Sequence, residues 1–467
     1  MLPRIIPDLG YDRGIFVSVA ERLIAGDVLY VDVWDNKDPL FFFGLAITRS
    51  ISPYFDVLGE VCWIASSALA VFVIAKWRGC GPITAWFASL GVSPLILTGS
   101  FYLPGHTHLP GIALTLWVFG ATVFRRFVVA GALVGILTFT KITMLPVAFL
   151  LLVIVVLVFH FWRAALLASV GFTLTAGGVL ALLLVRGEFE PYVESLIRNT
   201  AYSQGSLVDG QGSTFVRHLV MVASKQTLSV LVILLLMVIA VVLVHIRRGT
   251  PLWADQKSLI LWASLGSSLL GATVVLGLTG LWHHHCQVLY VPAILAVIGF
   301  MHLFQPVFNV RSALPATVFT ALAIGLAGHA SLTAYPESVM RSISNLPHLL
   351  SRLGSIPPEA QAVLSVGDRG TYARVGHNDD LGHAYGLGEW KLACPKFHQY
   401  PFDSVQTLRD VSVCLPGAQV IIVSPSARPI SNNETWNSYL SNVEVTLRLN
   451  YSCADWEGER ICVRRST

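Results

Sequence analysis

The feature that most constrains this chain is a series of apolar blocks, each long enough to cross a lipid bilayer. They fill the sequence from about Val57 to Tyr335, and a transmembrane helix needs roughly 17–25 apolar residues. Charged residues make up only 12% of the chain, about half their usual share in soluble proteins. The chain is therefore predicted to be a polytopic α-helical membrane protein. Its net charge of +4 gives no reason to expect a nucleic-acid partner.

The apolar blocks predict about ten transmembrane helices. They lie near residues 57–76, 82–100, 108–124, 127–143, 145–162, 164–185, 225–246, 258–280, 287–304 and 313–334. Basic residues gather in alternate connections, for example at Arg125 and Arg126, and the positive-inside rule makes those connections cytoplasmic. The other connections are then extracytoplasmic, and an even number of spans places both termini on that side as well.

Three regions follow from this pattern. Residues 1–56 are predicted to form an extracytoplasmic first loop with interfacial helices, residues 57–334 a transmembrane domain, and residues 335–467 a soluble extracytoplasmic domain. In the last region, strand-like runs ("AQAVLSVGD", "AQVIIVSPS", "VEVTLRLNY") alternate with helical patterns ("FDSVQTLRDV", "ETWNSYLSN"). This alternation predicts a small α/β domain. The opening "MLPRIIPDLGYD" lacks the apolar core of a cleavable signal peptide.

The cysteines agree with an exported last region. "YSCADWEGERICVRR" reads as two strands around a turn, so Cys453 and Cys462 are predicted to pair across a hairpin. Cys394 and Cys414 would then form the second pair. Disulfides persist in oxidising compartments, which fits an extracytoplasmic position.

The opening stretch "YDRGIFVSVAERLIAGDVLYVDVWDNKDPL" concentrates the polar chemistry. It holds five aspartates, at positions 12, 27, 32, 35 and 38. Its apolar residues Ile15, Phe16, Val19, Leu23 and Ile24 form one helical stripe that is too short to span a bilayer. We therefore expect a helix lying in the membrane interface, followed by an irregular acidic loop and a second interfacial or re-entrant helix at "LFFFGLAI".

The pattern "YDxGxF…ERLxxGxxxYxDxWDxKxPL" in this stretch resembles the first external loop of the C-type (GT-C) glycosyltransferases, in particular their protein-mannosyltransferase and aminoarabinose-transferase-like branch. "AGALVGILTFTKITML" is similar to that family's "aGlllGlallxK" span, and "WHHHCQVLYVPAILA" to its late "HYxxPxxP" segment. The resemblance implies a transferase that takes a sugar from a polyprenyl-phosphate donor at the outer membrane face. The acceptor would be an envelope glycan, a glycolipid or a protein.

The resemblance places the family's general base at Asp12, where it would take the proton of an acceptor hydroxyl during an inverting displacement. Asp12 also precedes a predicted helix and can cap it, and Asp8 is a nearby alternative base or substrate ligand. The leaving phosphate needs cationic stabilisation. Lys141, Arg13 and Arg198 are the candidates for that role.

The chain departs from the family pattern in three places. Arg13 stands where the family has a glutamate, and Asp38 where it has a proline. The family also has a transmembrane helix before this loop, which would bring the predicted number to eleven. We expect that the start codon is misassigned, with a truly absent first helix as the alternative.

Further substrate ligands are predicted around the first loop. Asp32, Asp35 and Lys37 either bind the acceptor or hold the loop, Asp32 by bonding the loop backbone and Asp35 by pairing with Lys37. Tyr202 lies with Arg198 in the longest external connection of the body and is expected to line the acceptor site.

Lys141 lies in the apolar run "LTFTKITML", where a lysine is costly and therefore a functional candidate, unless its amine snorkels to the headgroups. The histidines His106, His108, His283 and His284 lie on the same predicted side, where they either hydrogen-bond sugar or phosphate or, for at least two of them, have a structural role. A divalent metal held by His106, His108 and His284 is the alternative, although no cofactor is required by the pattern.

These features favour a membrane glycosyltransferase over two other classes. A transporter or flippase of a lipid-linked sugar would place charged groups and helix breaks near the bilayer midplane, often in repeated halves, whereas here the polar residues gather at one face. A non-catalytic envelope scaffold is the third possibility, and the soluble C-terminal region and the arginine at position 13 are the features that favour it.

Overall fold

The computed structural model describes residues 12–52, 55–93, 97, 107–159, 161–208, 255–279, 283–304, 371–376, 391–396, 399, 403–431, 433–456 and 459–465. The chain divides into two compact units. Unit 1 comprises Met1–Phe55, Leu182–Ser213 and Ser338–Thr467, and unit 2 comprises Asp56–Ala181 and Thr214–Glu337. The first loop and the C-terminal region, which are far apart in the sequence, therefore belong to the same unit.

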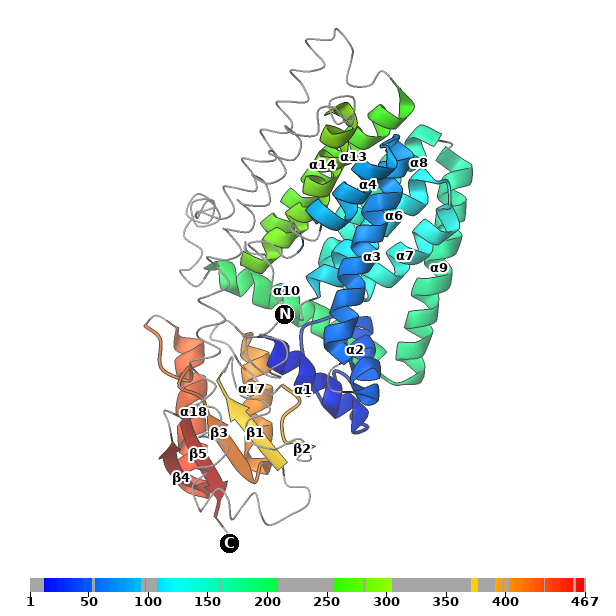
Figure 1. Ribbon diagram of the computed structural model, residues 1–467. Coiled ribbons are helices and arrows are strands. Elements are labelled where there is room, and N and C mark those ends of the chain that lie inside the picture. The colour runs from blue at the N-terminus through cyan, green and yellow to red at the C-terminus, as the bar shows by residue number, and fades with distance from the viewer. Residues whose placement is uncertain are drawn as a thin grey trace. The chain divides into compact units, whose positions relative to one another are not determined.

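Unit 2 is a bundle of apolar helices (Figure 1). In chain order its elements are α3 (Phe55–Arg78), α4 (Pro82–Trp86), the π-helix η2 (Phe87–Val92), α6 (His108–Val123), α7 (Phe127–Thr138), the 3-10 helix η3 (Ile142–Met144), α8 (Leu145–Phe159), α9 (Phe161–Val185), α13 (Gln256–Thr279), the 3-10 helix η4 (His283–Leu289) and α14 (Tyr290–Phe304). These helices coincide with the predicted spans, except that the spans at 225–246 and 313–334 lie outside the described residues.

Five segments of unit 2 are long and apolar enough to cross a bilayer: Leu58–Arg78, Ile142–Phe159, Phe161–Val185, Gln256–Leu276 and His285–Leu303. Helix α8 packs against α6 and α13, and α13 packs against α14. The last segment is 83% buried within the protein, whereas the α9 segment is only 22% buried. The helix α14 is thus central, and α9 presents most of its surface outward.

Three glycines allow α7 and α9 to lie in close contact. A Cβ atom at Gly131 of α7 would lie 1.8 Å from the Ala168 carbonyl oxygen of α9, and one at Gly171 of α9 would lie 1.9 Å from the Val128 carbonyl oxygen of α7. Gly131 and Gly135 form a G-x-x-x-G pair, which is typical of tightly packed membrane helices. Thr175 Oγ1 also donates a hydrogen bond of 3.1 Å to the Ala132 carbonyl oxygen.

In unit 1, helix α1 (Asp12–Ile24) packs against α2 (Pro39–Ile51). The predicted apolar stripe is buried along much of its length: Ile15, Phe16 and Val19 are each 8% exposed or less. The Phe16 ring lies 5.3 Å from that of Phe41, and Arg49 of α2 forms an ion pair of 2.6 Å with Glu21 of α1. The stripe therefore covers the second helix, and Ile24 at its end is 47% exposed.

The C-terminal part of unit 1 contains a five-stranded mixed sheet with the strand order β2-β1-β3-β5-β4. The strands are β1 (Thr371–Val375), β2 (Lys391–Leu392), β3 (Val420–Val423), β4 (Tyr451–Trp456) and β5 (Glu459–Arg464). Strands β2, β1 and β3 are parallel, whereas β5 is antiparallel to both β3 and β4. Helices α17 (Val405–Cys414) and α18 (Glu434–Asn450) accompany the sheet, and a 3-10 turn, η7 (Leu415–Gly417), follows α17.

One predicted strand is wrong. "VEVTLRLNY" shows strand-like alternation, yet all but its last residue belongs to α18. The buried residues of this helix are Trp436, Tyr439, Val443 and Leu447, which recur at helical spacing, while Val445 and Leu449 are 54% and 70% exposed. The Asn433 side chain also caps the helix by accepting a hydrogen bond from the Trp436 backbone N–H. Burial of one helical face and an N-cap outweigh the β-propensity of the valines.

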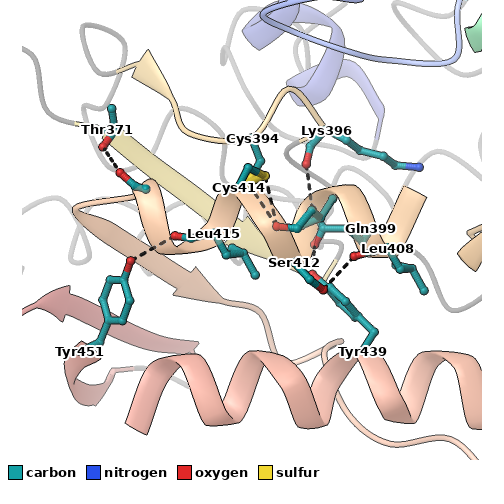
Figure 2. Close-up of a disulfide and its surroundings, with 12 residues drawn as sticks. Thr371, Cys394, Lys396, Gln399, Leu408, Ser412, Cys414, Leu415, Tyr439 and Tyr451 are labelled. Carbon is teal, nitrogen blue, oxygen red and sulfur yellow. Dashed lines mark hydrogen bonds between the residues drawn. A yellow bond between two sulfur atoms is a disulfide. The ribbon is translucent and has the colours of Figure 1, made fainter. Parts of the chain in front are cut away.

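Two disulfides tie this region together, and they join the cysteines that the sequence pairs. Cys453 and Cys462 lie opposite one another on β4 and β5 and are bonded across that hairpin. Cys394, which follows β2, is bonded to Cys414 at the end of α17 (Figure 2). The predicted strand at "AQAVLSVGD" lies outside the described residues.

Candidate functional site

The acidic first loop is held in unit 1 by a tyrosine in a left-handed backbone conformation. Tyr30 has φ +64°, which is uncommon for any residue but glycine. Its hydroxyl donates a hydrogen bond of 2.6 Å to the Lys37 carbonyl oxygen, and its ring lies 5.5 Å from that of Tyr192. These contacts close residues 30–37 into a compact turn.

The predicted substrate ligands of this loop occupy different environments. Asp32 is exposed and accepts a 2.8 Å hydrogen bond from the Val28 backbone N–H. Asp35 is only 2% exposed and accepts a 3.1 Å hydrogen bond from the Lys37 backbone N–H. The Lys37 amine bonds the Asn36 side chain and lies 5.2 Å from the centre of the Phe16 ring. Asp35 and Lys37 are thus linked through the Lys37 backbone.

One face of α10 (Phe189–Val208) forms further hydrogen bonds with the loop. The Tyr192 hydroxyl donates to the Asp38 carboxylate at 3.2 Å, the Ser195 hydroxyl to the Asp35 carbonyl at 3.4 Å, and the Asn199 amide to the Asn36 carbonyl at 3.4 Å. The three residues are spaced by three and four positions, so they share a helical face. Their spacing in "YVESLIRN" is the sequence signal of a shared polar face, which the sequence analysis does not predict.

Glu188, just before α10, is a further residue that the sequence analysis missed. Its side chain is 0% exposed and accepts hydrogen bonds from the Leu29 backbone N–H at 3.2 Å and from Arg186 Nε at 2.9 Å. Burial raises the pKa of Tyr30 and of Tyr192, and the nearby Asp38 carboxylate raises both further. The buried part of the loop therefore lies beside carboxylates and tyrosine hydroxyls whose pKa is raised.

Two predicted phosphate ligands belong to unit 1. Arg198 of α10 forms ion pairs with Glu194 at 2.5 Å and with Asp410 of α17 at 2.8 Å. Its contacts link α10 to the C-terminal region, so a phosphate at this guanidinium would compete with two carboxylates. Arg13 lies in the first turn of α1, where the structure describes the backbone alone.

Lys141 lies in unit 2, where α7 ends and η3 begins. The lysine is only 6% exposed. A Cβ atom at Gly111 would lie 3.1 Å from the Lys141 Cβ and Cγ atoms, so the stem of the lysine packs directly against the first turns of α6. The lysine is buried within the protein, and its role in phosphate binding stays a prediction.

His108 and His285 accompany Lys141 in unit 2. His108 begins α6 and is 3% exposed, and its ring lies 5.6 Å from that of His285 in η4. Both η3 and η4 contact α6, so the lysine and the two histidines gather near the N-terminal end of that helix. A buried amine, two imidazoles and a helix N-terminus together suit an anion.

The remaining predicted residues are described in part or not at all. Asp12, Tyr202, His283 and His284 have a described backbone: Asp12 begins α1, Tyr202 lies in α10, and both histidines lie in η4. Asp8 and His106 lie outside the described residues. Within the described part of the chain, no three His, Cys, Asp or Glu side chains are placed to hold a metal ion.

Comparison with known proteins identifies the fold. No protein-family model matches the chain, and no curated protein matches its sequence. Among solved structures, the crystal structure of ArnT from Cupriavidus metallidurans bound to undecaprenyl phosphate matches with a TM-score of 0.60 and 14% sequence identity. The match covers 97% of this chain and 93% of ArnT. The chain has the fold of ArnT. The predicted fold resemblance is thereby confirmed, and the chain is a polytopic membrane protein of that fold.

Proposed function

We propose that this protein is a membrane glycosyltransferase that moves a sugar from a polyprenyl-phosphate donor to an envelope glycan, glycolipid or protein. The observation that carries the proposal is the shared fold with ArnT over nearly the whole chain. The ArnT structure was solved with undecaprenyl phosphate bound. The buried amine and imidazoles of unit 2 and the acidic first loop of unit 1 supply two kinds of chemistry that such a transfer needs.

The donor phosphate is bound by Lys141 together with His108 and His285. As the bond breaks, the anomeric carbon gains positive charge and the departing polyprenyl phosphate gains negative charge. A buried ammonium group that donates hydrogen bonds stabilises this charge more strongly than an exposed one, because water does not screen it. Lys141, only 6% exposed, meets this requirement.

The acceptor hydroxyl is activated by Asp12. In the inverting displacement the hydroxyl oxygen bonds to the anomeric carbon as the bond from that carbon to the phosphate oxygen breaks. The hydroxyl proton passes to the Asp12 carboxylate, and the lipid phosphate leaves with the electron pair. Asp32, Asp35 and Lys37 orient the acceptor, Asp35 and Lys37 from within the ordered loop.

The reaction takes place on the extracytoplasmic side of a cell membrane. Basic residues in alternate connections orient the helices. The two disulfides of the C-terminal region support the same orientation, because such bonds persist in an oxidising compartment.

The test is sugar transfer in proteoliposomes that contain labelled polyprenyl-phosphate sugars and an envelope extract. We expect wild-type protein to form a labelled product, whereas movement of the donor across the bilayer without product would identify a flippase. Lys141→Met is expected to weaken undecaprenyl phosphate binding about tenfold or more, the value of a charge-assisted hydrogen bond. Lys141→Arg retains the charge and should recover part of the binding. Equal binding by all three proteins would remove Lys141 from the phosphate site.

A further inference from the structure

The residues that follow β2 lie at the carboxyl edge of the parallel strands, the edge at which α/β proteins commonly place their ligand sites. Here the segment Cys394–Lys396 instead meets the acidic first loop. The Trp34 backbone N–H donates a 2.8 Å hydrogen bond to the Pro395 carbonyl oxygen. The first loop is thus joined to the edge of the C-terminal sheet, and both belong to unit 1.

Lys396 is the charged centre of this junction. Its side chain is 9% exposed, its amine forms an ion pair of 2.5 Å with Asp403, and the same amine lies 4.5 Å from the centre of the Trp34 ring. Trp34 is itself 9% exposed. The tryptophan is therefore covered by a lysine, and its face is not a platform for sugar stacking.

The neighbouring Asp35 carboxylate contributes to the same charge balance. Burial lowers the pKa of Lys396, the carboxylates of Asp403 and Asp35 raise it, and Arg198 lowers it. Asp35 and Asp403 are 2% and 6% exposed. A buried carboxylate is stable only beside a compensating charge or hydrogen-bond donors, and Lys396 supplies positive charge to both.

The segment that carries Lys396 is fixed by covalent and polar contacts. Cys394 is bonded to Cys414 of α17, and Figure 2 shows Lys396 and Gln399 beside this disulfide. The Gln399 side chain donates a 3.0 Å hydrogen bond to the Lys396 carbonyl oxygen and accepts one from the Gly376 N–H after β1. Lys396 is consequently held at a fixed place on the sheet, from which it can define the position of the loop.

We propose that Lys396 is a positioning residue for the transfer reaction, because it anchors Trp34 and Asp35 of the acidic first loop to the C-terminal sheet. The role rests on the proposed function, and it gives the C-terminal region a part in catalysis that no motif in its sequence indicates. Without the ammonium group, Trp34 loses its cover and Asp403 loses its ion-pair partner, so the loop that orients the acceptor is released.

The test compares four proteins with wild type. Lys396→Met removes the cation, Lys396→Arg retains it, and Lys396→Met with Asp403→Asn removes the ion pair without leaving Asp403 as an unpaired buried carboxylate. Arg448→Met is the matched control, since Arg448 of the same region forms an exposed ion pair with Glu444. The measurements are kcat, the KM of each substrate, and hydrogen exchange of the amides in residues 28–38.

We expect the double variant to lose about tenfold or more in kcat, with the KM of the donor unchanged, since a displaced group of about 1 Å costs up to 10² in rate. The Trp34 amide should exchange at least about tenfold faster. Lys396→Arg should recover most of the activity, and Arg448→Met should match wild type.

Three outcomes overturn the inference, and they are distinguishable. If wild-type protein transfers sugar, a folded double variant with wild-type kcat and wild-type amide exchange contradicts the positioning role but not the proposed function. A wild-type protein that transfers sugar from no donor contradicts the proposed function itself, and the positioning role in that reaction with it. A loss of stability with faster exchange but unchanged kcat would show Lys396 to be structural only.

Discussion

At the scale of single residues, Gly111 sets how closely Lys141 approaches helix α6. A Cβ atom there would lie 2.9 Å from the Met144 Cγ atom and 3.1 Å from the Lys141 Cβ atom. Gly120, in the same helix, has no atom nearer than 3.8 Å to the corresponding position. Helix α6 therefore has room for a methyl group at Gly120 but not at Gly111.

We predict that Gly111→Ala displaces Lys141 and weakens undecaprenyl phosphate binding, with a stability loss of about 1–3 kcal/mol from overpacking. Gly120→Ala should leave binding unchanged and gain up to about 1 kcal/mol from helix propensity. Thermal unfolding and lipid titration of both variants measure the two effects. Equal binding by the two variants would contradict the close approach of Lys141 to α6.

The buried tyrosines give a prediction for alkaline pH. Burial raises the pKa of Tyr30, Tyr192 and Tyr439. Above a pH of about 10, the unfolded chain releases these protons while the folded protein retains them. A raised folded-state pKa contributes stability that is fully present below that pH and is lost as the pH rises further.

We predict that the thermal midpoint of wild-type protein falls between about pH 8 and about pH 10.5, and that Tyr192→Phe falls by less over the same interval. The variant should already be less stable at the lower pH, because it lacks the hydrogen bond to Asp38. A variant whose midpoint falls as far as that of wild type would show that Tyr192 titrates normally.

The sequence predicts some residues of the site better than others, for a physical reason. Lys141 is conspicuous because a lysine in an apolar run is rare and costly. Lys396 and Glu188 stand in polar surroundings in the sequence, and only tertiary contacts bury them. The environments of Asp32 and Asp35, three positions apart, likewise depend on the turn that Tyr30 closes.

At the scale of secondary-structure elements, the contact between α7 and α9 depends on backbone approach rather than on large side chains. The Gly131 position faces the Ala168 carbonyl group directly, whereas a Cβ atom added at Gly178 of α9 would have no neighbouring atom within 4 Å. We predict that Gly131→Ala forces the two helices apart and lowers stability by about 3 kcal/mol. Gly178→Ala should be neutral or slightly stabilising.

Detergent-resistance or thermal unfolding measurements on these two glycine variants test the contact. The expected order of stability is Gly178→Ala at or above wild type, and Gly131→Ala well below it. Similar stability of the two variants would mean that α7 and α9 are not in close contact.

Element types are predictable where one periodicity dominates. The helices of unit 2 follow from length and hydropathy, because the bilayer demands internally satisfied backbone groups. The segment 443–450 shows the limit: its valines and leucines alternate like a strand, and a single buried helical face at Val443 and Leu447 decides the outcome. Strand and helix would bury different side chains of this segment against other parts of the protein. A local sequence window does not contain those packing partners.

At the scale of the whole molecule, the apolar blocks predict a polytopic helical protein, and the first-loop pattern resembles that of the GT-C family. The likeness to ArnT, at 14% identity, shows the fold. The grouping of the first loop, residues 182–213 and the C-terminal region into one unit is not visible in the sequence. Contacts such as Trp34 with Pro395 and Arg198 with Asp410 join segments that are far apart in the chain. Such long-range pairings carry no local signal.

The most direct test of the account is sugar transfer by wild-type protein and Asp12→Asn in nanodiscs, with Asp455→Asn as an exposed carboxylate control. We predict transfer by wild type and by the control, and a loss of about 10²-fold or more for Asp12→Asn, the contribution of a general base. Undecaprenyl phosphate binding should persist in all three. Wild-type rates for Asp12→Asn would contradict Asp12 as the base, and no transfer from any polyprenyl-phosphate sugar by wild type would contradict the proposed function.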